Sequence, residues 1–95
     1  MSYLDDVAAV IRTELGEQPD DASAPELLRL YAVLLLAKRE AVNTEDVHNA
    51  WTAWIQNHQP THEDIKPFAD LDQSTQKADE PFVAAIQRAA RSLQL

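Results

Sequence analysis

The sequence has no cysteine and only one glycine, Gly16, among its 95 residues. The absence of cysteine excludes disulfide bonds, thiolate catalysis and thiolate metal ligands. One glycine cannot build a glycine-rich phosphate-binding loop, which excludes a P-loop or a dinucleotide-binding fold. No apolar run approaches the ~20 residues that a membrane-spanning helix requires. We therefore expect a protein that does not act in a membrane.

Basic residues are also scarce, because eight lysines and arginines face sixteen aspartates and glutamates, for a net charge of −8. Residues 1–26 carry seven acidic side chains and one arginine, and residues 59–81 carry six acidic side chains and two lysines. A nucleic-acid-binding protein needs a basic surface to displace counterions from phosphates. We therefore expect no nucleic-acid partner, whereas a basic protein would suit this charge.

The length and the composition are those of a single soluble domain. The chain is 45% hydrophobic and 25% charged, as is usual for globular proteins. A chain of this length can bury one modest core. The start, MSYLDDVAAVI, has acidic residues where a signal peptide carries positive charge, so we expect the mature chain to begin at Met1. The expectation is one domain over residues 1–95, located in the cytoplasm.

Apolar residues recur at helical spacing in four stretches, and no long alternating β pattern is present. Each stretch follows a residue type that commonly caps a helix. The four capping residues are Ser2, Ser23, Asn43 and Asp79, and the first three helices are expected to end near Gly16, Arg39 and Asn57. The second helix is apolar almost all round over residues 27–36, which predicts that it is the central, most buried helix.

Prolines divide the segment between the third and the last helix. Pro60 ends the third helix, because proline lacks the N–H that a helix interior requires. We expect one short turn helix over residues 61–65 and an ordered loop, PFADL, over residues 67–71. The predicted fold class is all-α: a compact bundle of four main helices plus a short turn helix, with a proline-marked ordered loop before the last helix.

The stretch WTAWIQNHQPTHEDIKPF, residues 51–68, holds both tryptophans and two of the three histidines. His58 and His62 are four residues apart, which on one helix would aim both rings at a shared metal, but Pro60 breaks that helix. His62 adjoins two carboxylates, yet neighbours in a turn rarely orient as a general base requires, and no nucleophile motif accompanies them. A histidine after a helix end more often bonds a backbone carbonyl. We expect no catalytic residue, no metal site and no cofactor, and hence no enzyme.

Trp51 and Trp54 lie three residues apart, near each other on one face of the predicted third helix. Either both rings fill a small core, or one of them lines a pocket or forms an exposed anchor, since tryptophan is enriched at binding hot spots. Any site is expected where that helix meets the turn that follows it. The candidate binding residues are His48, Trp51, Trp54, His62, Phe68 and Asp79.

Two sequence elements resemble those of a family of small uncharacterised helical proteins. The first is VHNAWTAW at residues 47–54, and the second is HEDIKPFADL with the later DEPFVAAI, within residues 62–86. That family belongs to actinobacteria and actinobacteriophages, and the resemblance extends roughly over residues 27–90. It implies a helical fold and no settled activity, cofactor or substrate.

More distantly, the second element resembles the tail of the helical repeat domain named after ryanodine receptors. A His, a Pro-aromatic pair, a Leu and an Asp recur there in the same order. Their counterparts here are His62, Pro67, Phe68, Leu71 and Asp79, with His48 and Trp51 upstream. Bacterial and phage domains of this type are suspected of binding nucleotide-derived ligands, although this chain lacks the glycine- and aromatic-rich segment that such repeats carry.

Two functions therefore remain open. The first is a non-enzymatic accessory protein, phage- or prophage-encoded, that acts by protein–protein interaction through an acidic helical surface. Its partner would be a host or self protein, a homodimer included. The alternative is a module that binds a small nucleotide-derived ligand, in which a tryptophan stacks on the ligand and His48, His62 and Asp79 supply polar contacts.

Overall fold

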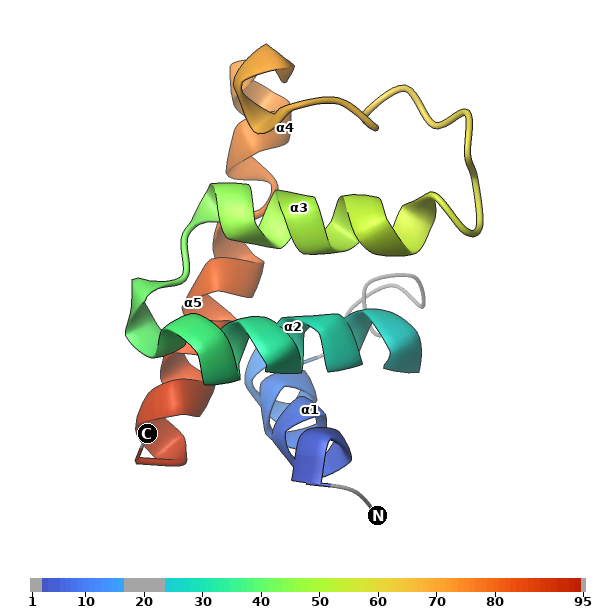
Figure 1. Cartoon of the computed structure of the whole chain (residues 1–95). Helices are drawn as coiled ribbons and strands as arrows, with labels where there is room; N and C mark the ends of the chain where they lie inside the picture. Colours follow the sequence, from blue (N-terminus) through green and yellow to red (C-terminus); the bar gives the residue numbers. More distant parts are fainter. Residues whose placement is uncertain (1–2, 17–23, 95) are drawn as a thin grey trace.

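The protein consists of helices joined by turns in the part of the chain that the structure describes. The structure is a computed structural model that describes residues 3–16 and 24–94. Its elements are α1 (Tyr3–Leu15), α2 (Pro25–Lys38), the 3₁₀ turn η2 (Arg39–Ala41), α3 (Thr44–Ile55), the 3₁₀ turn η3 (Phe68–Asp70), α4 (Gln73–Lys77) and α5 (Glu80–Ser92) (Figure 1). No strand occurs among these residues. The predicted all-α class, with four main helices and one short helix, is confirmed.

Local capping explains where α1 ends and where α3 begins. α1 ends at Gly16, whose φ of 73° lies in the left-handed region that glycine adopts without strain. Before α3, the Asn43 side chain accepts the Asp46 N–H and the Asp46 carboxylate accepts the Asn43 N–H, both at 3.0 Å. Both ends agree with the sequence-based prediction. The predicted capping residues Ser2 and Ser23 lie outside the described residues. Asp79 does precede α5, but its side chain accepts no capping hydrogen bond, so the prediction holds for its position only.

The short helix forms later in the chain than predicted. Residues 61–65 make turns instead of a helix. The Ile65 N–H bonds the His62 carbonyl and the Lys66 N–H bonds the Asp64 carbonyl, while the Asp64 N–H bonds the His62 ring nitrogen Nδ1 at 3.1 Å. α4 begins at residue 73 instead, where the Asp72 side chain accepts the Thr75 N–H at 2.8 Å. An aspartate three residues before a threonine is an ordinary capping pattern, and it was available in the sequence.

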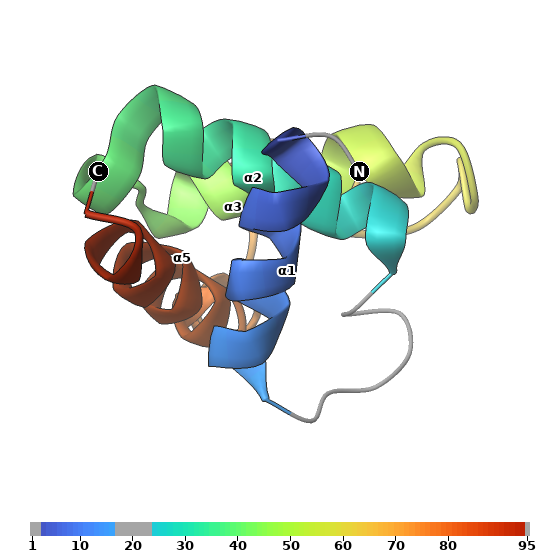
Figure 2. The same ribbon diagram turned by 90° about the horizontal axis from the view of Figure 1, so that it is seen from below.

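α2 is the central helix, as predicted, and contacts α1, α3 and α5. It runs antiparallel to α3, and α1 crosses it steeply on the opposite side (Figures 1 and 2). α5 contacts α1, α2 and α3, so the first and the last helix also pack against each other. α2 is not buried all round, however, because Val33 is 50% exposed.

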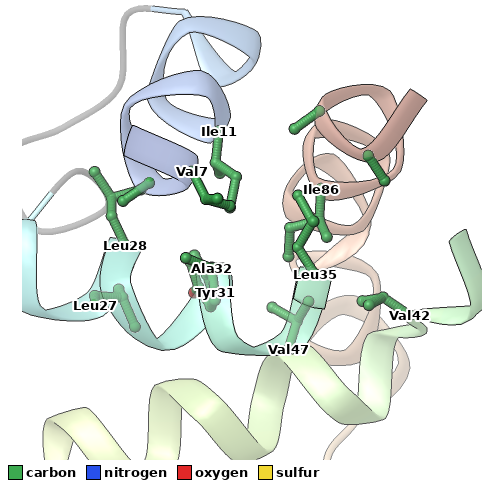
Figure 3. Packing of buried hydrophobic residues seen from close by; sticks show 13 residues of the cluster. Val7, Ile11, Leu27, Leu28, Tyr31, Ala32, Leu35, Val42, Val47 and Ile86 are labelled. Carbon is green, nitrogen blue, oxygen red and sulfur yellow. The ribbon is translucent and has the colours of Figure 1, made fainter. Parts of the chain in front are cut away.

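The core lies where these four helices meet. Figure 3 shows apolar side chains from α1, α2, α3 and α5 pointing toward one another. The largest fully buried side chains are Tyr31, Ile11, Leu27, Leu35, Ile86, Val7 and Val47. On α5 the fully buried positions beside Ile86 are alanines, which allow close approach of the neighbouring helices. Removing this apolar surface from water is the main stabilising contribution to the fold.

Residues 56–72, here called the return segment, lead from the end of α3 back to α4 (Figure 1). η3 and α4 both contact α3, so the segment and the short helix lie against it. The Gln76 side-chain amide donates hydrogen bonds to the carbonyls of Phe68 and Leu71, at 3.0 and 3.2 Å. Leu71, at the end of the predicted ordered loop, is buried. Over residues 3–16 and 24–94, no helix combines the length and the apolarity that crossing a bilayer would require.

Candidate functional site

A pocket of about 350 Å³ lies between α2, α3, the return segment and the junction of α4 with α5. Its walls are mostly apolar and aromatic, with a few polar side chains among them. The lining residues are Leu27, Tyr31, His48, Trp51, Trp54, Asp64, Thr75, Ala78, Asp79 and Phe82. A concave, mainly apolar pocket of this size with a few polar groups is typical of small-molecule sites.

Aromatic rings from three helices form the larger part of the wall. Tyr31 of α2 packs against Phe82 of α5, with ring centroids 5.8 Å apart. Trp51 and Trp54 of α3 both line the pocket, so the pair does not simply fill the core. Both indoles are half-buried. The Trp54 Nε1–H is itself buried and has no hydrogen-bond partner in the described part of the chain, an arrangement that is rare in native proteins.

His48 holds the return segment against α3. Its side chain is 3% exposed, and its Nε2–H donates a hydrogen bond to the Lys66 carbonyl at 2.7 Å. The ring stacks on Trp51 at a centroid distance of 5.8 Å and contacts Phe68 at 6.1 Å. The histidine that bonds a distant backbone carbonyl is therefore His48, whereas His62 accepts the N–H of nearby Asp64.

Asp79 is the pocket's most perturbed carboxyl group. The pKa of Asp79 is raised to about 6, mainly by partial burial. The charge of nearby His48 opposes this rise, and the charge of Asp64 adds to it. Burial also raises the pKa of the Tyr31 hydroxyl, and the Asp79 charge adds to this effect. Neither lysine nor arginine lines the pocket in the described residues. Two carboxyl groups thus face a pocket that contains no fixed positive charge.

Removal of the Asp79 charge should stabilise the protein above pH 6. The pKa rises from 3.8 to about 6 on folding, so the folded state holds the proton more tightly and stability falls as pH rises through that window. Solvent around the half-buried group reduces the effect to about 1–2 kcal/mol. Urea denaturation should show Asp79→Asn gaining this stability over the parent between pH 4 and pH 7. The exposed neighbour substitution Glu80→Gln is the control, and a gain independent of pH would contradict the burial of Asp79.

Four of the six candidate binding residues line the pocket: His48, Trp51, Trp54 and Asp79. The other two contact residues of its wall. The His62 ring meets Trp51 edge-on at a centroid distance of 5.0 Å, and Phe68 contacts His48. The structure therefore brings all six together around one pocket, at the junction of α3 with the return segment.

Sequence reasoning did not identify the other lining residues, above all Tyr31 and Phe82, which sit in apolar stripes and resemble core residues. Tyr31 has one feature that could have marked it, a polar hydroxyl on the buried face of a largely apolar helix, where the hydroxyl requires a hydrogen-bond partner or a pocket. For Asp64 the sequence indicated only that its carboxylate adjoins His62. Among the described residues no group of three His, Asp or Glu side chains is placed to hold a metal ion. His58 instead contacts the Glu26 carboxylate at 3.3 Å.

No curated protein and no solved structure matches the chain. One family model does match it, over residues 2–91, which is nearly the whole sequence. The chain therefore belongs to the family described as Domain of unknown function (DUF7701).

Proposed function

We propose that the protein is a non-enzymatic binding module that takes a small organic ligand in the pocket between α2, α3 and the start of α5. The observation that carries this proposal is the pocket itself, about 350 Å³ in volume and walled by aromatic rings from three helices. Natural binding sites have this size and this mixture of apolar wall and sparse polar groups. The sequence-based alternative of a small-ligand module is thus the function that the geometry favours.

The contacts of the histidines support a binding role over catalysis. His48 donates its Nε2–H to the Lys66 carbonyl, and Thr52 Oγ1 approaches the same nitrogen only at 3.4 Å. His62 Nδ1 is occupied by a backbone N–H. A hydroxyl nucleophile needs a base that is free to take its proton, and the His48 nitrogen nearest the Thr52 hydroxyl carries a proton of its own, which it donates to Lys66.

The charges of the pocket argue against a phosphorylated ligand. Phosphate groups are commonly held by arginine, lysine or helix N-termini. No lysine or arginine lines this pocket in the part of the chain described, and the helix N-terminus beside it, that of α5, carries the carboxyl groups of Asp79 and Glu80. Two carboxyl groups line it instead. We therefore restrict the proposed ligand to molecules without phosphate, which narrows the nucleotide-derived class to its nucleoside or base portion.

Docking onto a basic protein is the second candidate, favoured by the distribution of surface acids. Asp6, Glu45, Glu63, Asp70 and Glu80 are exposed. Ion pairs in the described residues involve other acids, such as Glu14 with Arg88 and Glu40 with Arg91. A host or self protein, a second copy included, remains the proposed partner. Cytoplasmic location, an actinobacterial or phage source and a relation to the ryanodine-receptor repeat are likewise proposals.

Filling the pocket should abolish ligand binding without unfolding the protein. Ala78 is exposed at the end of α4 and lines the pocket, so Ala78→Phe would place a ring in it. A bound ligand at a hundredfold excess over its Kd stabilises a protein by ~2.7 kcal/mol, which is readily seen as a shift in Tm. A library of amines, nucleosides, aromatic acids and neutral aromatics should give such shifts for the parent chain and none for Ala78→Phe.

The matched control is Ala53→Phe, the same substitution at an exposed position of α3 outside the pocket. Shifts that persist in Ala78→Phe, or an absence of shifts throughout the library, would refute the pocket as a ligand site. Native mass spectrometry of the gently purified protein separates the two candidates. A retained mass of a few hundred daltons supports the ligand, and a co-isolated basic chain supports docking.

A further inference from the structure

The aromatic wall provides the kind of surface that attracts positive charge. Tyr31, Trp51, Trp54 and Phe82 come from α2, α3 and α5 and line one pocket. The faces of such rings carry partial negative charge, and a cation placed against tryptophan or tyrosine gains ~0.5–2 kcal/mol, more as water is excluded. A neutral apolar ligand would use the same rings for contact area alone.

The carboxyl groups of the pocket distinguish cationic from neutral and anionic ligands more strongly than the aromatic rings do. Asp79 is half-buried, and of the two titratable groups that act on it, a charge on His48 favours the carboxylate and the charge of Asp64 disfavours it. A neutral ligand without a hydrogen-bond donor would displace water from the Asp79 carboxylate and put nothing in its place. An anionic ligand would add a further negative charge. A cationic ligand offsets the cost of desolvation by direct charge attraction, which is stronger than a hydrogen bond from a neutral donor.

The surroundings of the pocket reinforce this selection. Residues 59–81, which form most of the return segment, α4 and the start of α5, carry six acidic side chains and two lysines. Neither Lys66 nor Lys77 lines the pocket. The local excess of negative charge raises the concentration of cations at the mouth and slows the approach of anions.

We infer that the pocket selects an organic cation, an ammonium group with an apolar body, and holds the charged nitrogen between the aromatic rings and the Asp79 carboxylate. The inference rests on the proposed ligand-binding function and names the chemical class of its ligand. Asp79 supplies the counter-charge, Trp51 and Trp54 supply the ring faces, and His48 keeps the wall in place through Lys66.

Three probes of nearly equal shape test this selection by charge alone. They are choline, its neutral isostere 3,3-dimethyl-1-butanol, and the anion 3,3-dimethylbutanoate. Two-dimensional NMR titration of the full-length, isotope-labelled protein gives each Kd and locates the shifts on the pocket residues. We expect choline to bind at least tenfold more tightly than the alcohol, a difference of about 1.4 kcal/mol, and the anion to bind most weakly.

Asp79→Asn should weaken choline about tenfold and change the Kd of the alcohol by less than twofold. The control Glu80→Gln removes a neighbouring exposed charge that does not line the pocket, and it should leave both values within twofold. A choline preference that persists in Asp79→Asn would refute Asp79 as the counter-charge. If the variant did not fold, the order of the three probes on the parent chain would still decide for or against cation selection.

The outcomes separate failure of this inference from failure of the proposed function. If the alcohol or the anion binds the pocket as tightly as choline, cation selection is wrong and the ligand-binding function stands. If no probe shifts a pocket resonance and the mixed library also gives no response that Ala78→Phe abolishes, both are wrong. If amines of the library bind, neutral compounds do not, and Ala78→Phe abolishes the binding, the result supports both cation selection and the ligand-binding function.

Discussion

Replacement of His48 by alanine should lower the free energy of unfolding by about 2–4 kcal/mol and detach the return segment from α3. The substitution removes a buried ring, with a cavity cost in that range, and also the hydrogen bond to the Lys66 carbonyl. Trp51 and Phe68 lose the ring that they pack against. Urea denaturation measures the stability, and amide hydrogen exchange over residues 62–71 measures the detachment.

The control for this prediction is Asn49→Ala, an exposed position one residue further along α3. His48→Gln keeps a side-chain donor that can reach the same carbonyl and should recover part of the protection of the segment. If His48→Ala costs no more than Asn49→Ala, the ring does not anchor the segment. If protection is lost only globally, the segment does not open independently of the core.

Truncation of Leu35 to alanine should cost about 3–4 kcal/mol, the usual range for a leucine deleted from a close-packed core. Leu35 is 0% exposed, on the face of α2 that meets the buried cluster (Figure 3). A domain of this size has a total stability of ~5–10 kcal/mol, so the variant should have a greatly lowered Tm.

Leu36→Ala is the matched control, because it makes the same change one residue later, where the side chain is only half-buried. It should cost about 1 kcal/mol by loss of partial apolar contact. Thermal melts monitored by circular dichroism compare the two variants. Equal costs would mean that α2 does not present Leu35 to the core in the way described.

Sequence reasoning predicted the helical elements well where local chemistry decides them. The Asn43 capping box and the stop at Gly16 depend on neighbours within a few residues, and both occur. The short helix was predicted too early in the chain, because two neighbouring segments both carry residues that can cap a helix. His62 takes the N–H of Asp64, whereas Asp72 caps α4, and the sequence alone does not rank these two hydrogen bonds.

Part of the pocket wall could be predicted from composition, and part could not. Trp51 and Trp54 stood out because few aromatics occur in the chain, and both line the pocket. Tyr31 and Phe82 did not, because a residue in an apolar stripe shows whether it is near the core but not whether it faces a void. That distinction depends on the path of the return segment, which is held by contacts such as the one between His48 and Lys66, 18 residues apart.

The packing of α1 against α5 also constrains how the chain can be made. Ile11 near the start and Ile86 near the end are fully buried in the same cluster. During synthesis α1 and α2 leave the ribosome before α5, so the part of the α1 surface that packs against α5 stays uncovered until α5 has been made. We therefore expect the core to close only after α5 has been made, and nascent chains that stop short of α5 should be substrates for chaperones and proteases.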